Sequence, residues 1–75
     1  MKLDELQPGD CFSRPGDAAT HEGNPHLYMV CYPRVCDERN RIPIVQINGR
    51  TRGMTMQMPP NTEAKLEETS HVVVL

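Results

Sequence analysis

The sequence predicts an all-β domain, a small five-stranded antiparallel barrel with little or no helix. Its apolar residues fall in short runs, either alternating or continuous, which is the pattern of strands rather than of helices. Glycine, proline and asparagine separate these runs at intervals of about 8–12 residues, as in small sandwiches and barrels. The chain has 75 residues, which allow only one core, so residues 1–75 are expected to form a single domain.

The first half of the chain contains two predicted strands and one long loop. A single short turn is expected near Asp4. Pro8-Gly9 predicts a type II turn, since proline presets φ and glycine accepts a positive φ, and a short strand follows at Cys11-Phe12-Ser13. Residues 14–26 form a long loop of a kind that is usually functional or disordered. Residues 27–32 are apolar throughout, which predicts a central strand covered on both faces.

The clearest local signal in the second half is a β-hairpin. Residues 42–47 predict a strand, Asn48-Gly49 a two-residue type I′ turn, and the residues from Arg50 onward the return strand. A polar turn at residues 37–40 precedes the hairpin. The hairpin tip is therefore expected to be exposed, with an arginine beside it.

On the return strand, Met54, Met56 and Met58 alternate with polar residues and form one apolar face. Such a stripe is typical of a core, and a flexible binding surface is the alternative. Simple pairing across the turn puts arginines on the methionine side of the hairpin. We therefore expect a bulge at Gly53 that changes the face, and the alternative is that the arginine stems lie near the open end.

The last part of the chain contains one ambiguous segment and one clear strand. Ala64 and Leu66 alternate with charged residues, which favours a strand, whereas Asn61 or Thr62 could cap one helical turn. Residues 72–75 are β-branched and apolar, and predict a terminal strand docked in the sheet. Because there is no Trp, one Phe and two Tyr, aliphatic residues and the five Met are expected to supply the core.

The pattern Leu6-x-Pro-Gly-Asp-x-Phe12, followed by a hairpin with Gly49 and then by Met58-Pro-x-x-Thr62-x-Ala64-x-Leu66, resembles the small Src-homology-3-like barrels. It is also similar to short open reading frames of bacteriophages and prophages. The resemblance implies a barrel in which residues 14–26 form the first long loop. Peptide-binding members of this fold use an aromatic-lined groove, so the scarcity of aromatic residues argues against binding of proline-rich peptides.

The overall charge argues against a general nucleic-acid or membrane-surface binder. The net charge is −2, no stretch is apolar enough to span a membrane, and the N-terminus lacks the apolar core of a signal peptide. Three cysteines, an odd number, fit an intracellular protein better than a disulfide-stapled secreted one. We expect a cytoplasmic protein, located in the bacterial host cell if it is phage-encoded.

Two side-chain sets carry possible chemistry. His21, His26, Cys31 and Cys36 are candidate zinc ligands, but their four-residue gaps are looser than the usual ligand pairs, so no metal is expected. Five arginines lie between residues 32 and 53, opposed there by only two carboxylates. Arg39, Arg41, Arg50 and Arg52 could bind phosphate or carboxylate groups, or they could be solvated charges that protect sheet edges.

The sequence contains no catalytic motif, nucleotide loop or cofactor signature, which predicts a protein that is not an enzyme and needs no cofactor. The predicted function is a small binding or accessory module that acts by protein–protein contact with an unknown partner or with itself as a homo-oligomer. Its expected contact surface is the hairpin tip from Asn48 to Arg52 together with the 14–26 loop. The alternatives are a nucleic-acid-binding barrel that uses the arginines, and a small zinc-stabilised domain.

Overall fold

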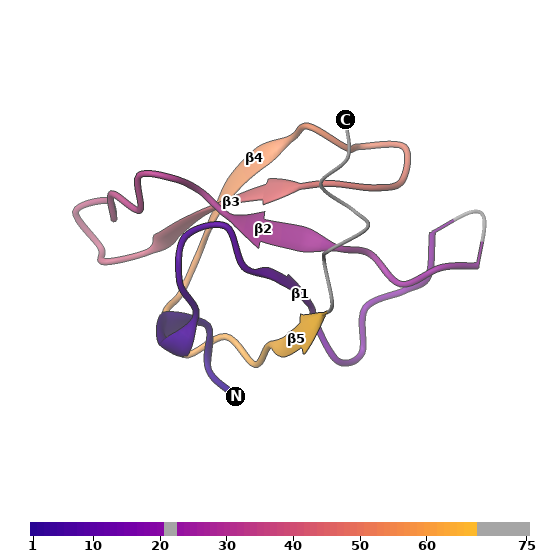
Figure 1. The fold of residues 1–75 in the computed structure, drawn as a ribbon, viewed down its shortest axis with the longest axis horizontal. Helices are drawn as coiled ribbons and strands as arrows, with labels where there is room; N and C mark the ends of the chain where they lie inside the picture. Colours follow the sequence, from indigo (N-terminus) through magenta and orange to yellow (C-terminus); the bar gives the residue numbers. More distant parts are fainter. Residues whose placement is uncertain (21–22, 68–75) are drawn as a thin grey trace.

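The computed structural model describes residues 1–20 and 23–67 (Figure 1). Its elements are short, and all but one are strands. In chain order they are the 3-10 turn η1 (Leu3–Glu5) and the strands β1 (Cys11–Ser13), β2 (Tyr28–Val30), β3 (Ile42–Gln46), β4 (Thr55–Met58) and β5 (Lys65–Glu67).

The strands form one antiparallel sheet in the order β4-β3-β2-β1-β5. The prediction of an all-β protein with five antiparallel strands is therefore confirmed, and β2 is the central strand, as its continuous apolar run indicated. Within the described residues β4 and β5 are the edges, and they do not pair with each other. Closure into a barrel is therefore not shown, and it stays a prediction together with the Src-homology-3-like resemblance.

The N-terminal segment crosses the connection between β4 and β5. The backbone N–H groups of Leu3 and Asp4 donate to the carbonyl oxygens of Thr62 (2.9 Å) and Pro60 (3.0 Å). The predicted type II turn follows, since Gly9 has a φ of 90° and the turn is closed by a hydrogen bond from Asp10 to the residue before Pro8. These contacts hold η1 against the connection between β4 and β5.

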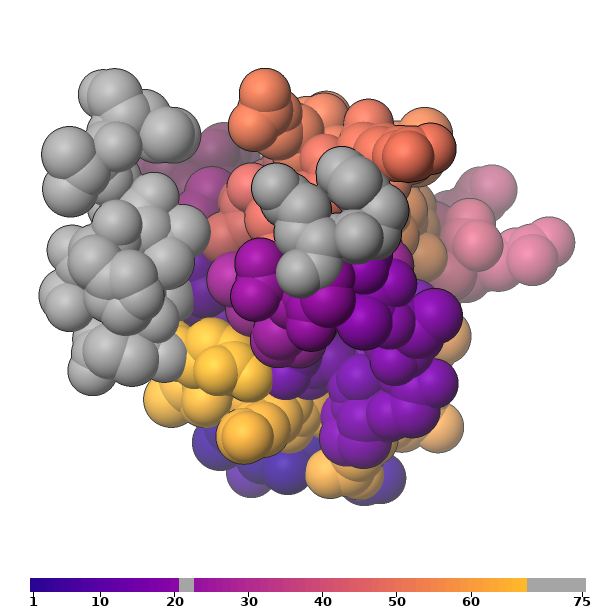
Figure 2. Space-filling model, turned by 90° about the vertical axis from the view of Figure 1, so that its right-hand side faces the viewer, coloured from indigo at the N-terminus to yellow at the C-terminus, as the bar shows by residue number. Residues whose placement is uncertain are grey.

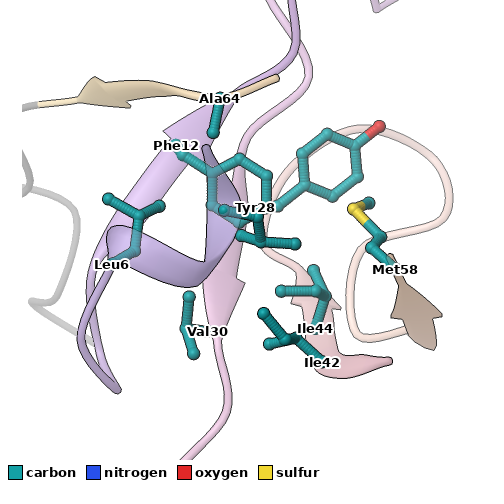
Figure 3. Packing of buried hydrophobic residues seen from close by; sticks show 9 residues of the cluster. Leu6, Phe12, Tyr28, Val30, Ile42, Ile44, Met58 and Ala64 are labelled. Atoms are coloured by element: carbon teal, nitrogen blue, oxygen red, sulfur yellow. The ribbon is translucent and has the colours of Figure 1, made fainter. Parts of the chain in front are cut away.

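The core lies between η1 and one face of the curved sheet (Figure 3). Phe12 and Tyr28 pack together at its centre, with ring centroids 5.5 Å apart. The expectation of an aliphatic and methionine core is therefore only half right, because two of the three aromatic residues are buried and only one methionine is. The buried cluster consists of Leu3, Leu6, Phe12, Tyr28, Val30, Ile42, Ile44, Met58 and Ala64.

The hairpin between β3 and β4 differs from the predicted one. Asn48-Gly49 is not a two-residue turn and the return strand does not start at Arg50, because the first β4 residue, Thr55, pairs with Val45. Asn48 does not have the positive φ that a type I′ turn requires. Residues 47–54 instead make a wider loop, which we call the hairpin loop.

The predicted bulge at Gly53 is confirmed. Gly53 N–H donates to the Gln46 carbonyl at 2.7 Å, and Gln46 N–H donates to the Met54 carbonyl at 2.9 Å. Two residues, Gly53 and Met54, therefore lie opposite the single residue Gln46. Gly53 has a φ of 88°, which is the conformation of the first residue in a glycine bulge. Beyond the bulge, the burial of the methionines increases along the chain: Met54 is 55% exposed, Met56 packs against the core, and Met58 is buried.

The ambiguous segment after Asn61 contains a strand. Glu63 forms an isolated bridge with Lys2, and β5 follows directly after Ala64. The described parts of the 14–26 loop contain no strand or helix, as predicted. The predicted strand at residues 72–75 lies outside the described residues.

Candidate binding surface

The side chain of Asn48 joins the hairpin loop to the end of the 14–26 loop. Its Oδ1 accepts a hydrogen bond from Leu27 N–H at 2.8 Å, and its Nδ2 donates to the Pro25 carbonyl at 2.9 Å. Ile47 N–H also donates to the Leu27 carbonyl. The two segments that the sequence predicted as a contact surface are therefore in contact, through an asparagine that sequence reasoning had placed in a turn.

The hairpin loop is held from inside as well. The amide of buried Gln46 donates to the Asn48 carbonyl at 2.8 Å and accepts from the Thr51 hydroxyl at 2.8 Å. Gly49, with a φ of 81°, lies so close to the neighbouring loop that an added Cβ would stand 3.3 Å from Thr20 Cγ2 and 3.4 Å from His26 Cδ2. We call the hairpin loop together with residues 14–20 and 23–26 the loop surface.

A second network holds the start of the 14–26 loop to the core. The Tyr28 hydroxyl donates to Asp17 at 2.9 Å, and Arg14 forms two hydrogen bonds to the same carboxylate. The Arg14 guanidinium also lies over the Tyr28 ring, 5.2 Å from its centroid. Partial burial, followed by the hydrogen bond to Asp17, raises the pKa of the Tyr28 phenol, so it remains a neutral donor at physiological pH.

On this framework Arg50 and Arg52 are exposed, and neither forms an ion pair or a side-chain hydrogen bond with the described residues. Arg14 and Asp17 on the same surface neutralise each other. Figure 2 shows this face, with the hairpin loop in salmon above the purple 14–26 loop. The loop surface thus presents two guanidinium groups without a carboxylate from the described residues to neutralise them.

Arg39 and Arg41 lie elsewhere. Arg41 directly precedes β3 and the hairpin loop directly follows it, so an extended strand places them roughly 20 Å apart at about 3.3 Å per residue. The two ends are opposite each other in Figure 1. The four arginines therefore do not form one continuous patch, because an extended strand separates Arg39 and Arg41 from Arg50 and Arg52.

Two arginine side chains at the far end, those of Arg34 and Arg41, have structural roles. Arg41 Nε donates to Asp37 at 2.8 Å, and the same carboxylate accepts from the backbone N–H groups of Arg39 and Arg41. The backbone hydrogen bond from Arg41, followed by its side-chain hydrogen bond, lowers the pKa of Asp37. Arg34 donates to the Leu6 carbonyl at 2.7 Å and thereby links this loop to the N-terminal segment.

The three candidate zinc ligands among the described residues, His26, Cys31 and Cys36, are not collected into a site. His26 precedes β2 and Cys31 follows it, so the two side chains start from opposite ends of one strand. Cys36 packs against the core, and His21 lies outside the described residues. Within residues 1–20 and 23–67, no three His, Cys, Asp or Glu side chains are placed to hold a metal ion.

No family model matches this chain, and neither a curated protein nor a solved structure matches it significantly. Of the helices in the described residues, none has the length and apolar character needed to cross a membrane.

Sequence reasoning missed one exposed group. Tyr32 was placed in the central strand, but β2 ends at Val30 and the Tyr32 side chain is 87% exposed. Val35, on the same loop, is 69% exposed. The signal that could have shown this is the density of turn-forming and charged residues directly after Tyr32.

Proposed function

We propose that this protein is a small non-enzymatic binding module, and that the loop surface is where it contacts a protein partner. The partner segment that this surface fits is an acidic one, because carboxylates pair with the planar donor groups of arginine in a two-point geometry. The module would act in the cytoplasm as an accessory factor, in a bacterial host if it is phage-encoded.

The observation that carries this proposal is the double hydrogen bond of Asn48. It joins two loops that are distant in sequence into one surface. Arg50 and Arg52 therefore lie on a loop that is fixed by hydrogen bonds. A loop that is already ordered loses less conformational entropy on binding than a slack one. Arginine is also among the residues that contribute most to binding energy at protein interfaces.

Nucleic-acid binding by the four arginines has less support. A phosphate-tracking groove needs cations in a continuous line, with aromatic platforms beside them. Here the arginines are divided between two ends, Arg41 is already paired with Asp37, and Tyr28 is buried. We keep nucleic-acid binding as a competing outcome of the experiment.

The experiment is site-specific photo-crosslinking in the native host, followed by affinity measurement. A photoreactive residue at position 52 should capture a protein, and the same residue at position 65, which is exposed on β5 and lies outside both loops, serves as the matched control. With the captured partner, the double variant R50E/R52E should bind at least about tenfold more weakly, whereas K65E should bind normally.

Two results would contradict the proposed function. One is an affinity that R50E/R52E leaves unchanged or that K65E lowers equally, which would show that the loop surface is not the contact. The other is a nuclease-sensitive crosslink with steep salt dependence, which would indicate nucleic-acid binding instead.

A further inference from the structure

The loop between β2 and β3, residues 31–41, exposes two large apolar side chains. Tyr32 is 87% exposed and Val35 is 69% exposed, the two highest values among the large hydrophobic residues of the described chain. Figure 1 shows this loop reaching away from the sheet on the side opposite the loop surface, and in Figure 2 it stands out in pink at the far side. Tyrosine is enriched at the centres of protein interfaces because its ring is large and rigid.

This loop is braced from several sides. Arg34 Nη1 donates to the Leu6 carbonyl at 2.7 Å, and Cys36 packs against the core. Asp37 closes the turn that follows by accepting three hydrogen bonds from the next four residues. Tyr32 and Val35 are therefore presented by a fixed loop, which reduces the entropy lost when a partner covers them.

Most of the charge around the two apolar side chains is already engaged, and residues 31–41 carry one positive charge in excess, three arginines against two carboxylates. Arg41 and Asp37 neutralise each other, and Arg34 donates to backbone carbonyls. The remaining charges, Glu38 and Arg39, are exposed neighbours of opposite sign whose side chains make no ion pair with other described residues. A phosphate backbone or a strongly acidic segment gains little from such a pair.

We propose that the 31–41 loop is a homodimer contact, in which a second copy of this chain covers Tyr32 and Val35. In a two-fold interface, if one residue of the first copy contacts another residue of the second copy, the reverse contact also forms. The patch must therefore be complementary to itself. Glu38 of one copy can then face Arg39 of the other, and the reverse contact forms at the same time. The loop surface does not fit this role, because two copies of Arg50 and Arg52 would repel each other.

The contact is small, so the dimer is expected to be weak. One loop per copy covers less than the roughly 800 Å² per partner that stable complexes bury. Association should therefore be dependent on concentration, in the micromolar to millimolar range. A dimer joined at this end would leave both loop surfaces free, and two linked binding sites hold a multivalent partner more firmly than one.

Sedimentation equilibrium across a wide range of concentration tests the proposal. The wild-type mass should rise from 8.5 kDa toward twice that value. E38R and R39E should each weaken dimerisation at least about tenfold, since each puts like charges opposite one another, and the double swap E38R/R39E should restore it. Y32S should also weaken the dimer, and R50E, at the other end, should not.

Several results would overturn the proposal. A wild-type protein that stays monomeric throughout would show that a second copy does not cover the patch. A dimer that survives E38R and Y32S, or that the double swap does not restore, would place the contact elsewhere. The proposed function stands or falls separately, because R50E/R52E tests partner binding and leaves the 31–41 loop intact. Backbone NMR spectra of each variant verify that the fold is retained.

Discussion

The two loops at the ends of β3 use arginine in opposite ways. In the 31–41 loop, Arg34 donates to the Leu6 carbonyl and Arg41 donates to Asp37, and these hydrogen bonds hold the loop in place. In the hairpin loop, an amide from Asn48 holds the backbone, and Arg50 and Arg52 point no donor at any described carboxylate. Arg34 and Arg41 are thus structural at one end of β3, whereas Arg50 and Arg52 are available for binding at the other.

The two loops are therefore ordered by different interactions, one by a local ion pair and the other by a non-local side-chain amide. An ion pair within four residues, such as that of Arg41 with Asp37, is local, and it neutralises the arginine that holds the loop. A side-chain amide that reaches a segment more than twenty residues away is non-local, and it leaves cations unpaired. The difference predicts that stability and binding should respond to different residues at the two ends.

The largest expected effect is that of N48A. It removes two hydrogen bonds and leaves Leu27 N–H, which is partly buried, without its acceptor, so we expect a loss of about 1–3 kcal/mol in the free energy of unfolding. Urea denaturation measures the loss, with Q57A on exposed β4 as a control that should change stability by less than about 0.5 kcal/mol. Equal stability of the two variants would show that Asn48 does not hold the loops together.

The next effect compares two glycines of the hairpin loop. G53A should cost about 1 kcal/mol, because its φ of 88° is strained for alanine and nothing lies within 4 Å of the new Cβ. G49A should cost more, because in addition to its own positive φ the Cβ stands 3.3 Å from Thr20 and Gln46. Thermal denaturation of both variants measures the difference, and a smaller cost at Gly49 would contradict the packing of the two loops.

At the other end, the carboxylate of Asp37 gives a pH dependence. Its pKa in the folded protein is below the ordinary value of 3.8, chiefly because the Arg41 backbone donates to it. A lowered pKa means that the stabilisation is complete above about pH 4 and is lost as the pH falls through the folded value. Carbon-13 NMR of the carboxyl group should show titration below 3.8, and D37N should lack this part of the pH dependence. A titration at or above the ordinary value would show that the brace is absent.

The smallest effect is expected for R50A and R52A, which should each change the free energy of unfolding by less than about 0.5 kcal/mol. R34A, which removes the donor to the Leu6 carbonyl, should cost about 1 kcal/mol and serves as the contrast. Chemical denaturation under one set of conditions compares all three. A loss at Arg50 or Arg52 as large as that at Arg34 would indicate that the hairpin arginines are structural too.

The sequence revealed the features that depend on neighbouring residues. The type II turn at Pro8-Gly9, the strand Cys11–Ser13, the bulge at Gly53 and the inward side of Met56 and Met58 all follow from local backbone preferences or from a period of two. The contact between the hairpin tip and the 14–26 loop was also expected, although not its mechanism.

The remaining features depend on contacts that no local pattern contains. The Asn-Gly pair predicts a tight turn at Asn48. Its side-chain amide instead forms hydrogen bonds with the backbone of Pro25 and Leu27. The arginines look like one block in the sequence because the five residues of β3 between them are few in number. Once extended, that strand separates the two groups in space. Tyr32 looked buried because it ends an apolar run, although the strand stops two residues before it.

The most direct test of the central claim, that Arg41 is held at one end of β3 while Arg50 and Arg52 are free at the other, is nitrogen-15 relaxation of their side-chain Nε–H groups. We predict an ordered Nε for Arg41, with an order parameter approaching that of rigid backbone at about 0.85, and values below about 0.6 for Arg50 and Arg52. If Arg50 and Arg52 are as ordered as Arg41, or Arg41 is as mobile as they are, the two ends do not differ and the account is contradicted.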